Sequence, residues 1–263
     1  MEIDINQNRE RRIRWYDPVW AALIFFTRLP FWRLYQPPKE CYRAVVEYWP
    51  LTGWLTGGLM AVTLWVGSLY LPYILAVLLA IIVRLLVTGA LHEDGLADFC
   101  DGFGGGGSDR ERILAIMKDS HIGTYGVLGL ILYELLLAAT LYTMTPEMAA
   151  LTIVAAAPYA RMVTSQLVMM MPYARREEEA KNLTVYRKMD IWAGVSLTLQ
   201  GLLPMAGYLW LTNAAWEMIL FIPCIVLYFL YLLIWRRLHG YTGDCCGAVC
   251  LLVELAVLIV STL

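Results

Sequence analysis

The stretch that decides the fold is the apolar run YILAVLLAIIVRLLVTGAL, residues 73–91, which continues directly into HEDGLADFCDGFGGGG, residues 92–107. The first part is interrupted only by Arg84 and has about the length, roughly 20 residues, that crosses a bilayer as a helix. The second part holds four carboxylates and one histidine within ten residues, followed by a glycine run. A polar site at the edge of a membrane fits this succession better than a solvated helix end followed by a linker.

The acidic residues are spaced for one face of a helix. Asp94 and Asp98 are four residues apart, and Asp98 and Asp101 are three apart, so a helix projects all three carboxylates together. No basic residue lies between them to relieve the repulsion, and such oxygen clusters usually bind a hard divalent cation shared with a substrate's phosphates. We therefore expect Asp94, Asp98 and Asp101 to bind Mg²⁺, with Mn²⁺ as the alternative, and Glu93 to be a fourth ligand or a base.

Composition places the chain in a membrane. Of the 263 residues, 60% are hydrophobic and 16% are charged, whereas soluble domains are nearer half and a quarter. A net charge of −2 gives no electrostatic basis for binding nucleic acid. The six cysteines show no metal-type spacing, so we expect reduced thiols. The fold class predicted is an all-α polytopic membrane protein with a single catalytic domain over residues 1–263.

Seven apolar segments are long enough to be membrane spans. They are residues 45–71, 73–91, 124–144, 148–171, 191–211, 216–235 and 248–263. Before them, residues 19–32 form a shorter aromatic-rich run that contains Arg28 and Pro30, which predicts an interfacial or re-entrant helix. Residues 109–120 predict a short amphipathic helix on the cytoplasmic surface of the membrane.

The Lys and Arg residues alternate between loops, which predicts the orientation. The arm of residues 1–17, which has no visible signal peptide, and the connections after the second, fourth and sixth spans carry Lys or Arg. The alternate connections, near Pro72, Pro146 and Asn213, carry none. We therefore expect the N-terminus, the basic arm and the acidic motif on the cytoplasmic side of a bacterial or archaeal inner membrane. Most cations of residues 175–188 are then topological anchors. The sequence leaves a homo-oligomer open.

Two arginines lie inside predicted spans, where a charge is costly and usually faces a polar cavity. Arg84 and Arg161 are candidates to bind substrate phosphate through their guanidinium groups. The alternative is a structural ion pair with Glu134 or Glu254.

Other polar residues near the motif are candidates for catalysis or substrate binding. His92 is a candidate to orient a ligand or to act as acid or base, although a histidine at a membrane interface is more often simply hydrogen-bonded. Gly104 and Gly105 offer backbone N–H groups to a phosphate or form a hinge. The remaining candidates are Lys118, Asp119 and Ser120 beside the motif, and Thr242 and Asp244 before the last span, where Asp244 is placed to complete the metal shell.

The acidic motif and the polar residues near it suit the transfer of a phosphate to a hydroxyl. Metal ions held by carboxylates bridge a diphosphate, lower the pKa of an attacking hydroxyl and stabilise the departing phosphate. No Ser, Cys or His nucleophile pair accompanies the motif, which argues against a covalent enzyme intermediate.

Several motifs together resemble the cobalamin synthase (adenosylcobinamide-GDP ribazoletransferase) family. They are LHEDGLAD at 91–98, DG at 101–102 with the glycine run, DRER at 109–112, MKDS at 117–120, IGTYG at 122–126, FTRLP at 26–30, YWPL at 48–51 with Gly53, PYAR at 172–175, and TGD at 242–244 with GA at 247–248. The resemblance implies an inner-membrane, Mg²⁺-dependent enzyme of nucleotide-loop assembly. Its substrates would be a corrinoid-GDP and α-ribazole or its 5′-phosphate, and GMP would leave. The carboxylates at 94, 98 and 101 would hold metal on the diphosphate.

The sequence departs from the family pattern at two places. His121 stands where an arginine is expected, which puts a phosphate contact there in doubt, and Phe99-Cys100 replaces small residues. Two other functions remain as alternatives. A CDP-alcohol phosphotransferase also uses clustered aspartates but wants Asp-Gly-x-x-Ala-Arg, whereas Asp98 follows Ala97 here. A cation transporter would distribute its acidic residues through the spans rather than gather them at one edge.

Overall fold

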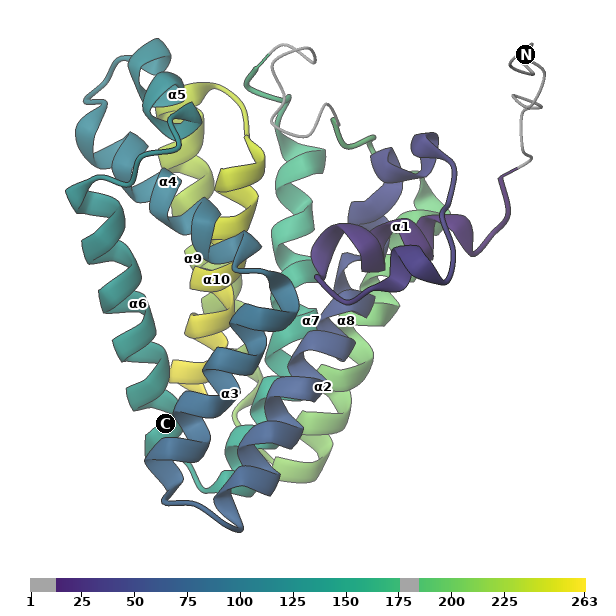
Figure 1. The fold of residues 1–263 in the computed structure, drawn as a ribbon, viewed down its shortest axis with the longest axis vertical. Helices are drawn as coiled ribbons and strands as arrows, with labels where there is room; N and C mark the ends of the chain where they lie inside the picture. Colours follow the sequence, from purple (N-terminus) through teal and green to yellow (C-terminus); the bar gives the residue numbers. More distant parts are fainter. Residues whose placement is uncertain (1–12, 176–184) are drawn as a thin grey trace, which may run out of the picture.

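A computed structural model of the chain describes residues 13–175 and 185–263, and the regular elements within these ranges are all helices (Figure 1). The basic arm up to residue 12 and the cations Arg176 and Lys181 lie outside the described residues. The first helices are α1 (Asp17–Phe26) and the 3₁₀ helices η2 (Phe31–Arg33) and η3 (Lys39–Tyr48). The others are α2 (Trp49–Ser68), α3 (Tyr73–Thr88), α4 (Leu91–Gly105), α5 (Arg110–Lys118), α6 (Thr124–Thr143), α7 (Pro146–Met170), α8 (Ile191–Thr212), α9 (Trp216–Leu238) and α10 (Gly243–Val260).

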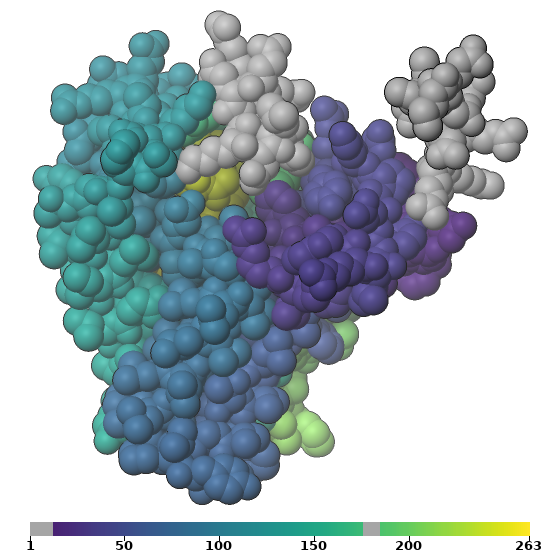
Figure 2. Space-filling model, viewed as in Figure 1, coloured from purple at the N-terminus to yellow at the C-terminus, as the bar shows by residue number. Residues whose placement is uncertain are grey.

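Helices α7 and α10 are the most buried of the membrane-length helices among the described residues and form the centre of the bundle. The chain packs α2 between α3 and α7, and α10 contacts α4, α7 and α9 (Figure 1). α10 is almost wholly buried along its length. Helices α1, η2 and η3, which we call the N-terminal layer, pack against one another and against the start of α2. Figure 2 shows the C-terminal segment, in yellow, set back between this purple layer and the blue and teal segments.

The all-helical fold class is confirmed, whereas the predicted count of seven spans is not. Among the described residues, four helices are long and apolar enough to cross a membrane, namely α6, α7, α9 and α10. Helices α3 and α4 pass the same test only as a pair, and they are bent by 90° at the break between them. The segments now seen as α2 and α8, which the sequence suggested as spans, are not among them.

The bend between α3 and α4 sets the direction of the acidic motif. Gly89 ends α3 with φ 65°, and Ala90 follows with φ 54°, so two consecutive residues adopt the left-handed conformation. Glycine does this at no steric cost, whereas alanine pays about 1 kcal/mol. The motif is helical, as predicted, but it leaves the apolar run at a right angle instead of extending it.

Several predicted boundaries shift in the structure. The first predicted span, residues 45–71, begins with the end of η3 and becomes α-helical only at Trp49. The last span begins at Gly243, earlier than the predicted residue 248, because Thr242 caps the helix by accepting a hydrogen bond from the backbone N–H of Cys245 at 3.2 Å. The predicted amphipathic helix at 109–120 is α5, whose first N–H groups bond the carboxylate of Asp109.

Candidate functional site

A cavity of about 180 Å³ lies where α4 and α10 begin. Its walls come from the N-terminal layer, the start of α2, the start of α4, the segments on both sides of residues 176–184, and the start of α10. The side chains that bear on chemistry are Trp49, His92, Asp94, Tyr173, Arg175, Tyr186, Thr242 and Asp244. We call this space the carboxylate cavity, because Asp94 and Asp244 both line it.

Two glycines bring the carboxylates together. A β-carbon added to Gly95 in α4 would lie 3.0 Å from the carbonyl oxygen of Asp244, and one added to Gly247 in α10 would lie 3.2 Å from the carbonyl oxygen of His92. The two backbones therefore approach more closely than side chains would allow. Asp94 is exposed and lies at the mouth of the cavity, whereas Asp244 is only 9% exposed and lies in its wall.

The carboxylate of Asp101 binds the start of α6 and does not line the carboxylate cavity. It accepts hydrogen bonds from the backbone N–H groups of Gly123 at 2.6 Å and Gly126 at 2.8 Å, at the start of α6. A carboxylate at this position satisfies N–H groups that have no partner within the helix and interacts favourably with the helix dipole. Asp98 is half-buried on α4 and does not line the carboxylate cavity.

The predicted four-ligand shell is not assembled in this arrangement. In the part of the chain that the structure describes, no three His, Cys, Asp or Glu side chains converge as a metal-binding group. Asp101 caps α6, and Glu93 turns to an arginine instead of the cavity. The carboxylates that share a cavity are Asp94 and Asp244, the residue that the sequence suggested as an additional ligand. The metal roles of Asp98, Asp101 and Glu93 stay predictions.

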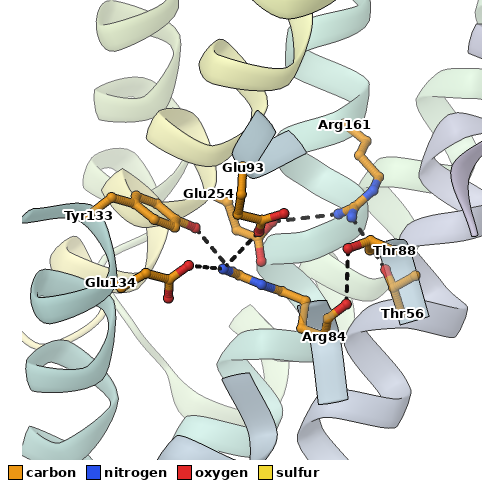
Figure 3. Close-up of polar contacts among 8 residues, drawn as sticks. All are labelled: Thr56, Arg84, Thr88, Glu93, Tyr133, Glu134, Arg161 and Glu254. Carbon is orange, nitrogen blue, oxygen red and sulfur yellow. Dashed lines mark hydrogen bonds and ion pairs between the residues drawn. The ribbon is translucent and has the colours of Figure 1, made fainter. Parts of the chain in front are cut away.

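Glu93 belongs to a buried charge network made of Arg84, Glu93, Glu134, Arg161 and Glu254 (Figure 3). Nη2 of Arg84 lies 3.1 Å from Glu93 and 3.4 Å from Glu134, and Arg161 lies 3.5 Å from Glu254. Figure 3 shows the two arginines approaching from different helices with Glu93 and Glu254 between them. Both arginine side chains are 4% exposed.

Neutral partners complete this network. Arg84 donates a hydrogen bond to the hydroxyl of Tyr133 at 3.0 Å, and Arg161 donates to Thr56 at 3.3 Å. Neither arginine lines the carboxylate cavity. The structure thus gives both arginines the ion pairs that the sequence offered as the alternative. No contact here supports the predicted phosphate binding by Arg84 or Arg161.

His92 is part of a stacked aromatic group with Trp49 and Phe26. Its ring is parallel to Trp49, with centroids 5.7 Å apart and planes within 5°, and Trp49 stacks in turn on Phe26 at 5.1 Å. His92 is 3% exposed, and its Nε2 has no hydrogen-bond partner among the described residues. Its position in the cavity wall is compatible with a contact to substrate, and its role as acid or base stays a prediction.

The other predicted binding residues lie outside this cavity. Lys118, Asp119 and Ser120 are exposed, and Lys118 lines a separate cavity of about 750 Å³. The Asp119 carboxylate contacts Nδ1 of His121 at 2.6 Å, which raises the pKa of His121 and lowers the pKa of Asp119. A β-carbon at Gly104 would lie 2.5 Å from the ring of Tyr125, so the missing side chain leaves room for this ring to pack against α4. Gly105 is the last residue of α4.

Sequence reasoning missed four residues of the cavity wall, one of which is Tyr186. Trp49, Tyr173 and Arg175 were not singled out for binding, although each stands in a segment that resembles the family. A short backbone pairing brings Tyr173 and Arg175 to the start of α10: Ala174 donates its N–H to the carbonyl of Tyr241 at 2.8 Å, and Tyr241 donates its N–H to the carbonyl of Pro172 at 3.0 Å. Convergence of the separate family-like segments was the signal that would have found them.

The chain is similar to known proteins over most of its length. A model of the family described as cobalamin-5-phosphate synthase matches residues 18–262. Three proteins named adenosylcobinamide-GDP ribazoletransferase are similar over most of their length. The protein of Shewanella frigidimarina is 35% identical over 93% of this chain and 96% of its own. That of Leptothrix cholodnii is 37% identical over 89% and 90%, and that of Leptospira interrogans 34% over 86% and 88%. No solved structure matches the chain.

Proposed function

We infer the function from one premise: the chain belongs to the cobalamin-5-phosphate synthase family. We propose that it transfers the phosphocobinamide group of adenosylcobinamide-GDP to a ribose hydroxyl of α-ribazole, or of α-ribazole 5′-phosphate. GMP leaves, and adenosylcobalamin or its 5′-phosphate forms. The names of the similar proteins support the substrates. Asp94 and Asp244 line one cavity together with Arg175, and this observation supports assigning the reaction to these residues.

The donor atoms of this pair fit magnesium. Mg²⁺ prefers oxygen ligands and is usually bound by one or two carboxylates together with water and substrate phosphates, so a pair is sufficient. Asp94 and Asp244 would hold the ion, and Asp98 is the nearest further carboxylate on the same face of α4. When bound, the ion would neutralise charge on the diphosphate and favour ionisation of the attacking hydroxyl.

Arg175 is the cation of the cavity. It donates one hydrogen bond to the carbonyl of Leu114 at 3.1 Å, while its buried Nε has no partner among the described residues. A guanidinium with an unused donor suits a phosphate oxygen, since it binds such anions in a fixed planar geometry. Arg175 would therefore hold the transferred phosphate opposite the carboxylates.

Two tyrosines supply neutral donors. Burial raises the pKa of Tyr173 and of Tyr186, so both hydroxyls keep their protons at neutral pH. Both line the cavity beside Phe25 and Trp49. An apolar wall with hydroxyl donors would orient a substrate hydroxyl and exclude water, which would otherwise compete as the acceptor of the phosphate.

The location of the reaction follows from the charge pattern of the loops. Cations cluster in the connections on one side, which favours the cytoplasmic side of the cell membrane for the carboxylate cavity. The substrates would then reach it from the cytoplasm.

The proposal is tested with the purified full-length chain in detergent. With Mg²⁺, adenosylcobinamide-GDP and α-ribazole it should release GMP and form adenosylcobalamin. The control is Asp190→Asn, which changes an aspartate at the start of α8 and should keep full activity. Absence of GMP release would reject the proposal. Release of CMP from a CDP-alcohol instead would favour the phosphotransferase alternative.

A further inference from the structure

A second cavity adjoins the carboxylate cavity. It measures about 790 Å³ and lies between α1, η3 and the bend from α3 to α4. The two cavities share Phe25 and Leu91 in their walls. Its charged lining residues are Arg28, Lys39, Arg43 and Glu40, three cations against one carboxylate. We call it the basic cavity.

The carboxylate cavity is too small for a whole nucleotide substrate. Pockets that bind small molecules usually measure about 300–1,000 Å³, whereas the carboxylate cavity measures about 180 Å³. A substrate whose diphosphate reaches Asp94 must therefore place its nucleoside in a neighbouring space. Two spaces of suitable size adjoin it: the basic cavity, and the cavity of about 750 Å³ that shares Tyr173 and Arg175.

The hydrogen bonds of the lining cations distinguish these two spaces. In the 750 Å³ cavity, Arg110 donates to the carbonyls of Leu238 and Ala174, and Arg175 donates to Leu114, so these arginines tie α5 to its neighbours. In the basic cavity, two cations, Arg28 and Lys39, have no side-chain hydrogen bond or ion pair among the described residues, whereas in the 750 Å³ cavity this holds for Lys118 alone. Uncompensated cations in a concave site attract anions, so the basic cavity has the stronger attraction for phosphate.

Arg28 is held beside the start of the acidic motif. Its backbone N–H donates to the carbonyl of Val87 at 2.7 Å, and its side chain crosses Gly89, where a β-carbon would lie 2.5 Å from Cγ of Arg28. The glycine at the bend thus does two things: it allows the left-handed turn and leaves room for the arginine. Any residue with a side chain at position 89 would displace Arg28 from the bend.

We propose that the basic cavity binds the nucleoside monophosphate part of the donor substrate, with Arg28 and Lys39 contacting its phosphate. This inference rests on the proposed function for the identity of the nucleotide. A diphosphate would lie across the shared wall at Leu91, with the transferred phosphate at Asp94 and the departing phosphate toward Arg28. The cations would then stabilise the negative charge that remains on the departing nucleotide when the P–O bond breaks. The oxygen of the acceptor hydroxyl takes its place on the transferred phosphorus, and the hydroxyl proton is released to solvent.

The test measures binding of labelled GMP to the full-length chain in nanodiscs of neutral phosphatidylcholine. Because one charge-assisted hydrogen bond is lost, Arg28→Gln and Lys39→Gln should each weaken GMP binding by about 10-fold. Arg33→Gln changes an exposed arginine of the same N-terminal layer that does not line the cavity, and it should bind GMP as the wild type does. Equal GMP binding by Arg28→Gln and the wild type, or no binding by either, would overturn the inference.

A second arm separates a nucleotide from a lipid headgroup, which carries the same phosphate chemistry. Replacing part of the phosphatidylcholine by phosphatidylglycerol should leave GMP binding unchanged. If phosphatidylglycerol weakens GMP binding to the wild type but not to Arg28→Gln, the cavity takes lipid and the inference fails. Because GMP binding needs no turnover, failure of the ribazole transfer itself would show separately as absent GMP release with intact, Arg28-dependent binding.

Discussion

Gly95 of α4 and Gly247 of α10 meet at backbone distance: a β-carbon on Gly95 would lie 3.4 Å from Cα of Gly247. This contact is what places the carboxylates of Asp94 and Asp244 in one cavity, although the two residues are 150 positions apart in the sequence. The distance between the helices therefore has direct consequences for the chemistry, and it can be changed by one methyl group.

Gly95→Ala should separate the two helices. The added carbon would lie 3.0 Å from the carbonyl oxygen and 3.2 Å from the Cα of Asp244, both backbone atoms that have no rotamer to change. We expect GMP release to fall by at least about 10-fold and the stability to fall by about 1–3 kcal/mol, the usual cost of overpacking. Gly58→Ala is the control, since nothing lies within 4 Å of its added carbon. Equal rates for Gly95→Ala and the control would show that the contact does not position the site.

Arg84→Met should destabilise the protein. It leaves the buried Glu93 and the half-buried Glu134 without their cation, and breaking a buried ion pair such as Arg84–Glu93 from one side costs about 3–5 kcal/mol. Adding Glu93→Gln should recover part of this loss, because the uncompensated carboxylate is removed. Thermal unfolding of both single variants and the double variant in one detergent measures the coupling. Strictly additive losses would mean that Arg84 and Glu93 do not interact.

Asp101→Asn should weaken the start of α6 rather than the binding of magnesium. An amide replaces one of the two accepting oxygens with a donor that faces a backbone N–H, which costs about 2 kcal/mol. The melting temperature should fall, while the Mg²⁺ concentration for half-maximal GMP release stays near that of the wild type. A rise of 10-fold or more in that concentration would instead support the sequence prediction that Asp101 is a metal ligand.

Cys41 should be almost unreactive toward alkylating agents. Burial in the N-terminal layer, assisted by the charge of Asp17, raises the pKa of Cys41 to about 11. Since only the thiolate reacts, a pKa of about 11 in place of the usual 9 lowers the reactive fraction at pH 8 by about 100-fold. Mass spectrometry after timed iodoacetamide treatment of the folded protein follows this rate. Rapid labelling of Cys41 would show that η3 does not cover it.

Local patterns in the sequence predicted much of the fold. The apolar composition predicted a helical membrane protein, and the spacing of Asp94, Asp98 and Asp101 predicted a helix, which is α4. The bend before it was not predicted, because one glycine at the end of an apolar run is equally compatible with a continuous span. The left-handed conformation of Ala90 has no sequence signal at all.

The site was predicted only in part, because its residues converge from distant segments. Asp94 and Asp244 were both named from their sequence surroundings, and both line the cavity. Asp101 was expected beside them, but three residues along a helix do not reveal that α6 begins nearby and offers two N–H groups. Arg175 could not be distinguished from a topological anchor without the pairing of Tyr173 with Tyr241.

The central claim is that Asp94 and Asp244 hold one magnesium-bound diphosphate, and a Mg²⁺ titration of GMP release tests it most directly. Asp94→Asn and Asp244→Asn should each lower the maximal rate by at least about 100-fold or raise the Mg²⁺ requirement by at least about 10-fold, since a hydrogen bond or ligand to a charged group is lost at the reacting phosphate. Asp190→Asn should leave both quantities unchanged. If either cavity variant retained the wild-type rate and the wild-type Mg²⁺ requirement, the account would be contradicted.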